Sequence, residues 1–79
     1  MHTVVMPKLS DTMEEGKILS WLKQEGDAVA AGESVVEVEA EKANHELESP
    51  VSGRIEELVA AEGDEVKVGA TLAIIAVDG

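Results

Sequence analysis

The sequence predicts an all-β domain, a sandwich or barrel in which one structural unit occurs twice. Residues 16–38 align with residues 53–75 without a gap, and three glycines fall in register in this alignment. Between the glycines, apolar β-branched residues form short runs separated by turn signals, a pattern typical of sandwiches and barrels. The chain has 79 residues, enough for one small domain, which we place over residues 1–79.

The internal repeat is the stronger of these observations. Identical residues occupy seven aligned pairs of positions: Gly16/Gly53, Ile18/Ile55, Glu25/Glu62, Gly26/Gly63, Asp27/Asp64, Val29/Val66 and Gly32/Gly69. A repeat of this length indicates one small unit used twice. Two copies are too few for an open solenoid. We therefore expect the halves, about 1–40 and 43–79, to close on each other around a pseudo-two-fold axis.

Each copy predicts the same series of elements. A glycine opens a strand, a Glu-Gly-Asp turn follows, a very short strand comes next, and a second glycine leads into a longer strand. The expected strands are residues 17–22 and 54–59, positions 29 and 66, and residues 34–39 and 71–77. We expect Gly26 and Gly63 to adopt positive φ in equivalent turns, because glycine enters that region without steric cost.

Residues 55–63 are the segment in which local propensity disagrees with this scheme. Taken alone, "IEELVAAEG" contains good helix formers. Its aligned partner, residues 18–26, includes Ser20 and Trp21 and is a poorer helix. The repeat therefore favours a strand at the start of residues 55–63.

Residues 36–48, between the two copies, predict a hairpin of half-buried strands. Apolar and polar residues alternate with a period of two, which separates them onto opposite faces. One face carries Val36, Val38, Ala40, His45 and Leu47, and the other carries Glu37, Glu39, Glu41, Asn44, Glu46 and Glu48. Lys42 then lies at the apex of the hairpin, exposed and within reach of another enzyme.

Composition excludes several classes of function. The net charge is -11, from 17 acidic and 6 basic residues, which is the wrong sign for binding nucleic acid. The chain has no cysteine, no metal-ligand spacing, no phosphate-binding glycine loop and no apolar run long enough to span a membrane. The N-terminus lacks the pattern of a signal peptide. We expect a cytoplasmic protein, or a mitochondrial matrix protein if a targeting segment has been removed.

Lys42 is better suited to attachment than to catalysis. An exposed amine near neutral pH is mostly protonated, and a protonated amine is not a nucleophile. A Schiff-base lysine would need a desolvated pocket instead. No pair of groups suited to acid–base or nucleophilic catalysis is visible, so we predict no catalytic residue.

The motifs around these positions resemble the lipoyl domains of the acyltransferase components of 2-oxo acid dehydrogenase complexes. The pattern M-P-x-L-S-x-T-M-x-x-G is matched by Met6, Pro7, Leu9, Ser10, Thr12, Met13 and Gly16. The pattern W-x-x-x-x-G-D-x-V-x-x-G is matched by Trp21, Gly26, Asp27, Val29 and Gly32. "EAEKA", residues 39–43, is similar to the family's E-T-D-K-A hairpin. The resemblance extends over essentially the whole chain.

This resemblance implies a fold and a role. The fold would be a flattened β-barrel of two four-stranded antiparallel sheets. Lys42, flanked by Glu41 and Ala43, would carry lipoic acid in amide linkage after modification by a lipoate ligase or a lipoyl/octanoyl transferase. The lipoyl-lysine would shuttle acyl groups and reducing equivalents between a thiamine-diphosphate-dependent decarboxylase, an acyltransferase core and dihydrolipoamide dehydrogenase.

Acidic residues near Lys42 suggest how a partner would recognise the domain. Hairpin alternation places Glu39, Glu41, Glu46 and Glu48 on one solvent face, and the resemblance places the loop "LSDTMEEG" beside the hairpin. We therefore expect basic residues of the decarboxylase to recognise the domain through contacts with Glu39, Glu46, Asp11, Glu14 and Glu15.

The match to the family has three departures. Ala40 replaces the usual threonine, Glu41 the usual aspartate, and His45 an apolar residue. The first two leave size and charge similar, and they are compatible with a branched-chain or acetoin-type complex. We expect His45 to be half-buried near the sheet edge, with a direct role at the dithiolane as the alternative.

A biotin carrier domain and a structural module of the same fold are the alternatives. Biotin carrier domains also place a lysine on the hairpin, but usually between methionines. The fold occurs as a structural module in membrane-fusion proteins, where a long insertion splits the halves. The glycine-cleavage carrier protein has extra elements at both ends.

Overall fold

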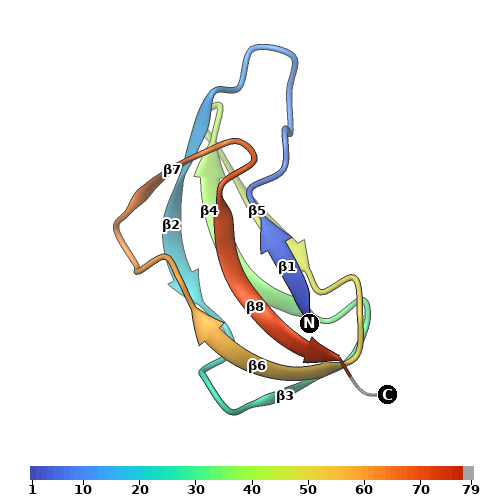
Figure 1. Ribbon diagram of the computed structural model, residues 1–79. Helices are drawn as coiled ribbons and strands as arrows, with labels where there is room; N and C mark the ends of the chain where they lie inside the picture. The colour runs from blue at the N-terminus through green and yellow to red at the C-terminus, as the bar shows by residue number, and fades with distance from the viewer. Residues whose placement is uncertain (78–79) are drawn as a thin grey trace.

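The computed structural model describes residues 1–77, and Asp78 and Gly79, the last two residues of the predicted domain, lie outside this range. The described residues form eight strands and no helix (Figure 1). The strands are β1 (His2–Val5), β2 (Glu15–Trp21), β3 (Ala28–Val29), β4 (Ser34–Ala40), β5 (Ala43–Glu48), β6 (Gly53–Leu58), β7 (Glu65–Lys67) and β8 (Thr71–Val77). Residues 1–77 contain no helix that is long and apolar enough to cross a membrane.

The strands make two four-stranded antiparallel sheets, in the orders β1-β8-β6-β3 and β5-β4-β2-β7. The two orders correspond position by position: β8 occupies the place that β4 has in the other sheet, β6 the place of β2, and β3 the place of β7. Each sheet contains two strands from each half of the chain, so the halves are interleaved. The predicted all-β fold with a pseudo-two-fold repeat is confirmed, including strand β6 where helix formers are frequent.

One strand and the pairing of two others were not predicted. β1 is a four-residue strand at the edge of its sheet, outside the region covered by the repeat. The short strands β3 and β7 do not pair within their own halves. β3 of the first half pairs with β6 of the second half, and β7 of the second half pairs with β2 of the first half. Each half therefore adds a short strand next to a long strand of the other half.

Aliphatic side chains fill the space between the sheets. The fully buried ones include Ile18, Val36, Val38, Leu72 and Ile75. The indole of Trp21 is also buried, and its N–H donates to the carbonyl of Ala60 at 2.8 Å, so that the aromatic ring adds apolar area without an unpaired donor.

Backbone hydrogen bonds between the halves explain the identities in the repeat. Each isoleucine of the aligned pair bonds the Glu-Gly-Asp turn of the opposite half, in two mirrored sets. The four bonds are Gly26 N–H to Ile55 O (2.8 Å), Gly63 N–H to Ile18 O (2.7 Å), Ile55 N–H to Asp27 O (2.9 Å) and Ile18 N–H to Asp64 O (2.9 Å). The turns therefore connect the two sheets as well as reversing the chain.

The acidic side chains of the same turns have mirrored partners. Glu25 accepts a hydrogen bond from the Leu58 N–H at 2.9 Å, and Glu62 accepts one from the Trp21 N–H at 3.0 Å. The aspartates close their own turns, with Asp27 accepting from the Gln24 N–H and Asp64 from the Ala61 N–H, both at 2.9 Å. Every residue of Glu-Gly-Asp thus has a structural task.

Two kinds of glycine recur in the repeat. Gly26 and Gly63 have φ of 92° and 91°, which confirms the predicted equivalent turns, and open space surrounds the position of a Cβ at both. Gly53 instead has no room for a side chain, because a Cβ there would overlap the carbonyl oxygen of Ala76 on the neighbouring strand.

We predict that Gly26→Ala and Gly63→Ala will each lower the free energy of unfolding by about 1–2 kcal/mol, the cost of a left-handed conformation for an L-residue. The two losses should be similar, because the turns are equivalent. Urea denaturation of the two variants measures both.

D-alanine at either position, introduced by chemical synthesis, is the matched control, because it adds the same methyl group but favours positive φ. It should leave stability close to that of the glycine protein. Equal losses with L- and D-alanine would contradict the explanation by backbone conformation.

Candidate functional site

Lys42 lies in the tight turn between β4 and β5. Ala40 and Ala43 face each other in the strand register, which leaves Glu41 and Lys42 as a two-residue connection. Their φ angles are 54° and 65°. Positive φ at both central residues is the signature of a type I′ turn, whose twist matches that of the flanking strands. Lys42 is exposed at the apex of the hairpin, where the alternation of residues 36–48 predicts it.

The lysine turn lies at the opposite end of an elongated molecule from the start of β1 and the end of β8. The principal extents are 37 × 21 × 17 Å, and Figure 1 shows the β4–β5 connection at the end away from the N-terminus and the end of β8. Lys42 therefore projects away from the end at which β1 starts and β8 finishes.

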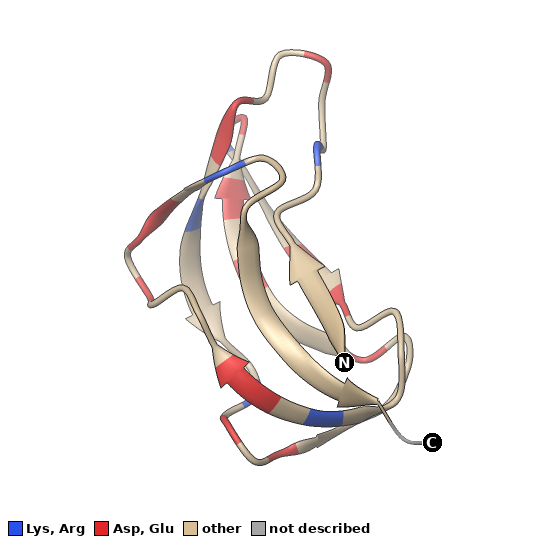
Figure 2. Cartoon of the chain, in the orientation of Figure 1, with Lys and Arg blue, Asp and Glu red and all other residues tan. Residues whose placement is uncertain are grey.

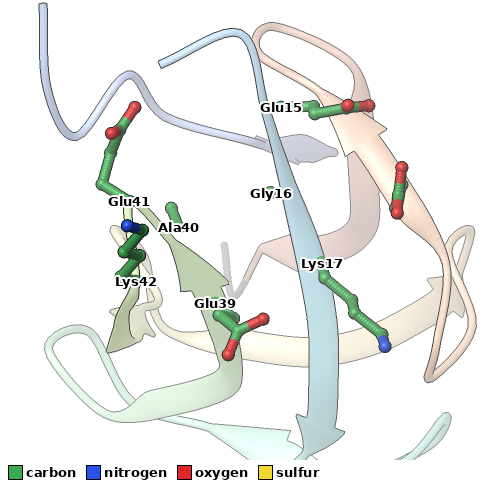
Figure 3. Close-up of a pocket in the computed structure, with 8 residues that line it drawn as sticks. Glu15, Gly16, Lys17, Glu39, Ala40, Glu41 and Lys42 are labelled. Carbon is green, nitrogen blue, oxygen red and sulfur yellow. The ribbon is translucent and has the colours of Figure 1, made fainter. Parts of the chain in front are cut away.

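An open groove of about 440 Å³ runs beside the turn (Figure 3). Its lining comes from strands of both halves: Glu15, Gly16, Lys17, Glu39, Ala40, Glu41, Lys42 and Glu65. Carboxylates outnumber amines among these side chains by four to two. The groove is therefore a shallow acidic surface, suited to contact with basic groups.

The loop between β1 and β2 lies next to the lysine turn, as expected. The hydroxyl of Thr12 donates to the Glu41 carboxylate at 3.2 Å, across 29 positions of the sequence. Figure 2 shows acidic segments of this loop and of the start of β2 at the same end of the molecule as the hairpin tip. Asp11, Glu14 and Glu15 are exposed, and Glu15 lines the groove itself.

The structure divides the acids that were expected to surround Lys42. Glu39 and Glu41 line the groove next to the lysine. Glu46 lies farther down β5, opposite Glu37, and accepts a hydrogen bond from the Ser34 hydroxyl at 3.1 Å. Glu48 pairs with Ser34 in register, at the far end of the hairpin. These last two acids share the predicted solvent face but are remote from the tip.

Two groove residues were not identified from the sequence. Lys17 and Glu65 face each other in the register of β2 and β7. β7 reaches this site only because it pairs with the opposite half. The repeat could have suggested the position of Glu65 only if the exchange of the short strands had been recognised.

His45 is half-buried on β5, which is the edge strand of its sheet. It is opposite Val38 and shares the inward side of the strand with buried Leu47. This position agrees with the predicted packing role.

Other chemistry is not evident near the turn. Across residues 1–77 no group of three or more His, Cys, Asp or Glu side chains could hold a metal ion. Within the same residues, Lys23 and Glu33 form an ion pair with an N···O distance of 2.8 Å. The hydrogen bond from the Lys23 ammonium lowers the pKa of the Glu33 carboxyl. The amine of Lys42 has no ion-pair partner in the described part of the chain.

Comparison with known proteins relates this arrangement to a family. The model of the family described as "Biotin-requiring enzyme", which covers biotinyl and lipoyl domains, matches residues 2–75. The succinyltransferase component of the 2-oxoglutarate dehydrogenase complex of Staphylococcus saprophyticus is 45% identical over 75 residues, which are 95% of this chain and 18% of that protein. The acetyltransferase component of the acetoin cleaving system of Pseudomonas putida is 41% identical over 75 residues, 95% of this chain and 20% of the relative.

A solved structure shows the same fold. The lipoyl domain of the 2-oxoglutarate dehydrogenase complex of Azotobacter vinelandii superposes with a TM-score of 0.82 at 29% identity, and the match covers 100% of both chains. The present chain spans a fifth or less of the two curated relatives.

We predict that His45→Met will leave the melting temperature unchanged or slightly raised. The ring is half-buried beside Leu47, and methionine fills irregular apolar space without a polar group to satisfy. Circular dichroism melts measure the effect. A loss of several degrees would show that the imidazole makes a structural contact that methionine cannot replace.

Proposed function

The chain belongs to the biotinyl and lipoyl attachment family, as a lipoyl domain, and on this premise we propose that Lys42 is its point of lipoic acid attachment. The position of Lys42 is the main support for the proposal. It is exposed, it occupies a two-residue turn, and it projects from the end of the domain that is remote from the start of β1 and the end of β8. Lipoic acid is the cofactor that lipoyl domains carry on a lysine.

The surroundings of Lys42 fit a covalently attached arm. The amine is accessible and forms no ion pair within residues 1–77, so amide formation would break no salt bridge there. The adjoining groove is open rather than enclosed, which leaves room for a modifying enzyme. When attached, lipoic acid would supply a dithiolane that accepts acyl groups and electrons.

The chain's own residues would display and orient the arm. The hairpin places the attachment point at the end of the domain away from the start of β1, and tethering raises the effective concentration of the arm at each active site that it can reach. We assign no catalytic residue to this domain. It would serve as a carrier within an acyltransferase component.

The partners that follow from this role are the enzymes of a multienzyme complex. They are a thiamine-diphosphate-dependent decarboxylase, an acyltransferase core, dihydrolipoamide dehydrogenase, and a lipoate ligase or lipoyl/octanoyl transferase. The similar relatives belong to a 2-oxoglutarate and to an acetoin system, so the substrate of the complex would be a 2-oxo acid or acetoin. Glu41 and Ala43, rather than methionines, flank the lysine, which favours lipoate over biotin.

We predict that lipoylation occurs at Lys42 and at none of the other lysines, Lys8, Lys17, Lys23 and Lys67. Lys42→Arg should abolish it while leaving the fold intact. Intact mass after expression with lipoate separates lipoylated, biotinylated and unmodified chains, and peptide mapping locates the group. Amide formation removes one positive charge, so the net charge changes from -11 to -12 and a native gel should resolve the two forms. Modification of Lys42→Arg would refute the assignment.

The acids of the groove are proposed to steer a basic partner surface toward the lysine. Glu15, Glu39 and Glu41 line the groove together with Lys42. Because Glu15 belongs to β2 whereas Glu39 and Glu41 belong to the hairpin, their charges form one patch only in the folded protein. Long-range attraction of this kind accelerates encounter, and dissolved salt screens it.

We predict that Glu39→Gln combined with Glu41→Gln will lower kcat/KM for reductive acylation by about threefold or more at low ionic strength, and less at high ionic strength. Glutamine keeps an oxygen for Thr12, so the change is mainly in charge. Glu56→Gln with Glu57→Gln, on exposed positions of β6 in the other sheet, is the control with the same charge change. Equal losses in the two double variants would indicate a general effect of net charge.

A further inference from the structure

The lysine turn has a backbone conformation that its residues do not favour. Type I′ turns are usually built from Asn-Gly or Asp-Gly, because both central residues need positive φ. Here Glu41 and Lys42 occupy these places with φ of 54° and 65°. An L-residue with a long side chain is disfavoured in this region, and such conformations persist where neighbouring contacts hold them.

One side-chain contact reaches the turn from elsewhere in the chain. Within residues 1–77, the side-chain hydrogen bond made by the turn residues joins the Glu41 carboxylate to the Thr12 hydroxyl, at 3.2 Å. Both residues are exposed, and they are brought together only by the fold. The contact joins the β1–β2 loop to the hairpin apex.

Thr12 is itself held in place by its neighbours. Met13 is 4% exposed, its N–H donates to the Ser10 carbonyl at 3.2 Å, and its sulfur accepts from the Leu9 N–H at 3.2 Å. The carbonyl of Glu14 accepts from the Val68 N–H at 3.0 Å. The loop is thus anchored to the core and to the β7–β8 turn on the C-terminal side of Thr12, which makes Thr12 a fixed point for an otherwise exposed apex.

We propose that Thr12 is a positioning residue for Lys42. Its hydrogen bond to Glu41 holds the type I′ turn in one orientation against the β1–β2 loop, so that the lysine and the acids of the loop are presented together as one surface. This inference rests on the proposed function, because it assigns Thr12 to recognition of the lipoylated domain by the decarboxylase. The partner chemistry implied is a basic surface that contacts the loop and the turn simultaneously.

Loss of the hydroxyl should act on recognition rather than on the chemical step. Without the bond, the apex samples other orientations, and a partner must select the competent one, which weakens its apparent affinity by the competent fraction. A single net hydrogen bond corresponds to a factor of about two to ten in such an equilibrium. We expect KM for reductive acylation to rise by about this factor in Thr12→Val, with kcat nearly unchanged.

The experiment compares four lipoylated proteins: wild type, Thr12→Val, Thr12→Ser and Thr3→Val. Serine keeps the hydroxyl and should restore wild-type behaviour. Thr3 is an exposed threonine on β1, away from the hairpin apex, and serves as the matched control. Acylation is measured with the decarboxylase component of the source organism, using pyruvate, 2-oxoglutarate, a branched-chain 2-oxo acid or acetoin, whichever acylates the wild type fastest. Melting temperatures check that the variants are folded.

Backbone 15N relaxation provides a readout that does not depend on function. Order parameters of Glu41 and Lys42 should fall in Thr12→Val and stay at wild-type values in Thr12→Ser and Thr3→Val. Unchanged order parameters together with unchanged KM in Thr12→Val would overturn the inference, as would a fall in kcat at constant KM. Failure of the proposed function is distinguishable, because the wild type would then carry no lipoate on Lys42, whereas the relaxation data would still test the contact.

Discussion

The fold depends on a reciprocal set of backbone hydrogen bonds between the two halves. Ile18 and Ile55 each bond the glycine and aspartate of the opposite Glu-Gly-Asp turn, at 2.7 to 2.9 Å. A small domain with one aromatic residue has a limited apolar core, so tight turns that save chain entropy matter more than usual. Because each turn also connects two sheets, closing one half requires the other half to be present. This reciprocity explains why the same residues recur in both copies.

The interleaving of the halves also determines where the functional end lies. β3 and β7 pair with strands of the other half, which closes the sandwich along its length and leaves the β4–β5 connection projecting at one end (Figure 1). The hairpin is supported by β2 on the β4 side, and its apex can display a residue without itself being part of the core. The domain therefore separates stability, which is a property of the paired turns and aliphatic core, from display, which is a property of the apex.

At the apex, conformation and charge act together. Positive φ at Glu41 and Lys42 matches the twist of β4 and β5 and orients the lysine outward. Carboxylates from β2, the hairpin and β7 line the groove beside it, and neighbouring like charges cost some stability. Sites that retain an unfavourable arrangement are often sites of function. Here both the strained turn and the acidic groove lie at the residue proposed to carry the cofactor.

The sequence by itself determined the local features: the turns with positive φ, the strand character of residues 36–48, the burial of Val38 and Leu47, and the place of Lys42. Each depends on period, glycine placement or repetition, which a linear pattern records. The tertiary structure alone decided the exchange of β3 and β7, the approach of Thr12 to Glu41, and the arrival of Glu65 in the groove, while Glu46 turned to Ser34. These contacts depend on which distant strands pair, and that pairing is decided by core packing and by hydrogen bonds between the halves rather than by the alternation within any one segment.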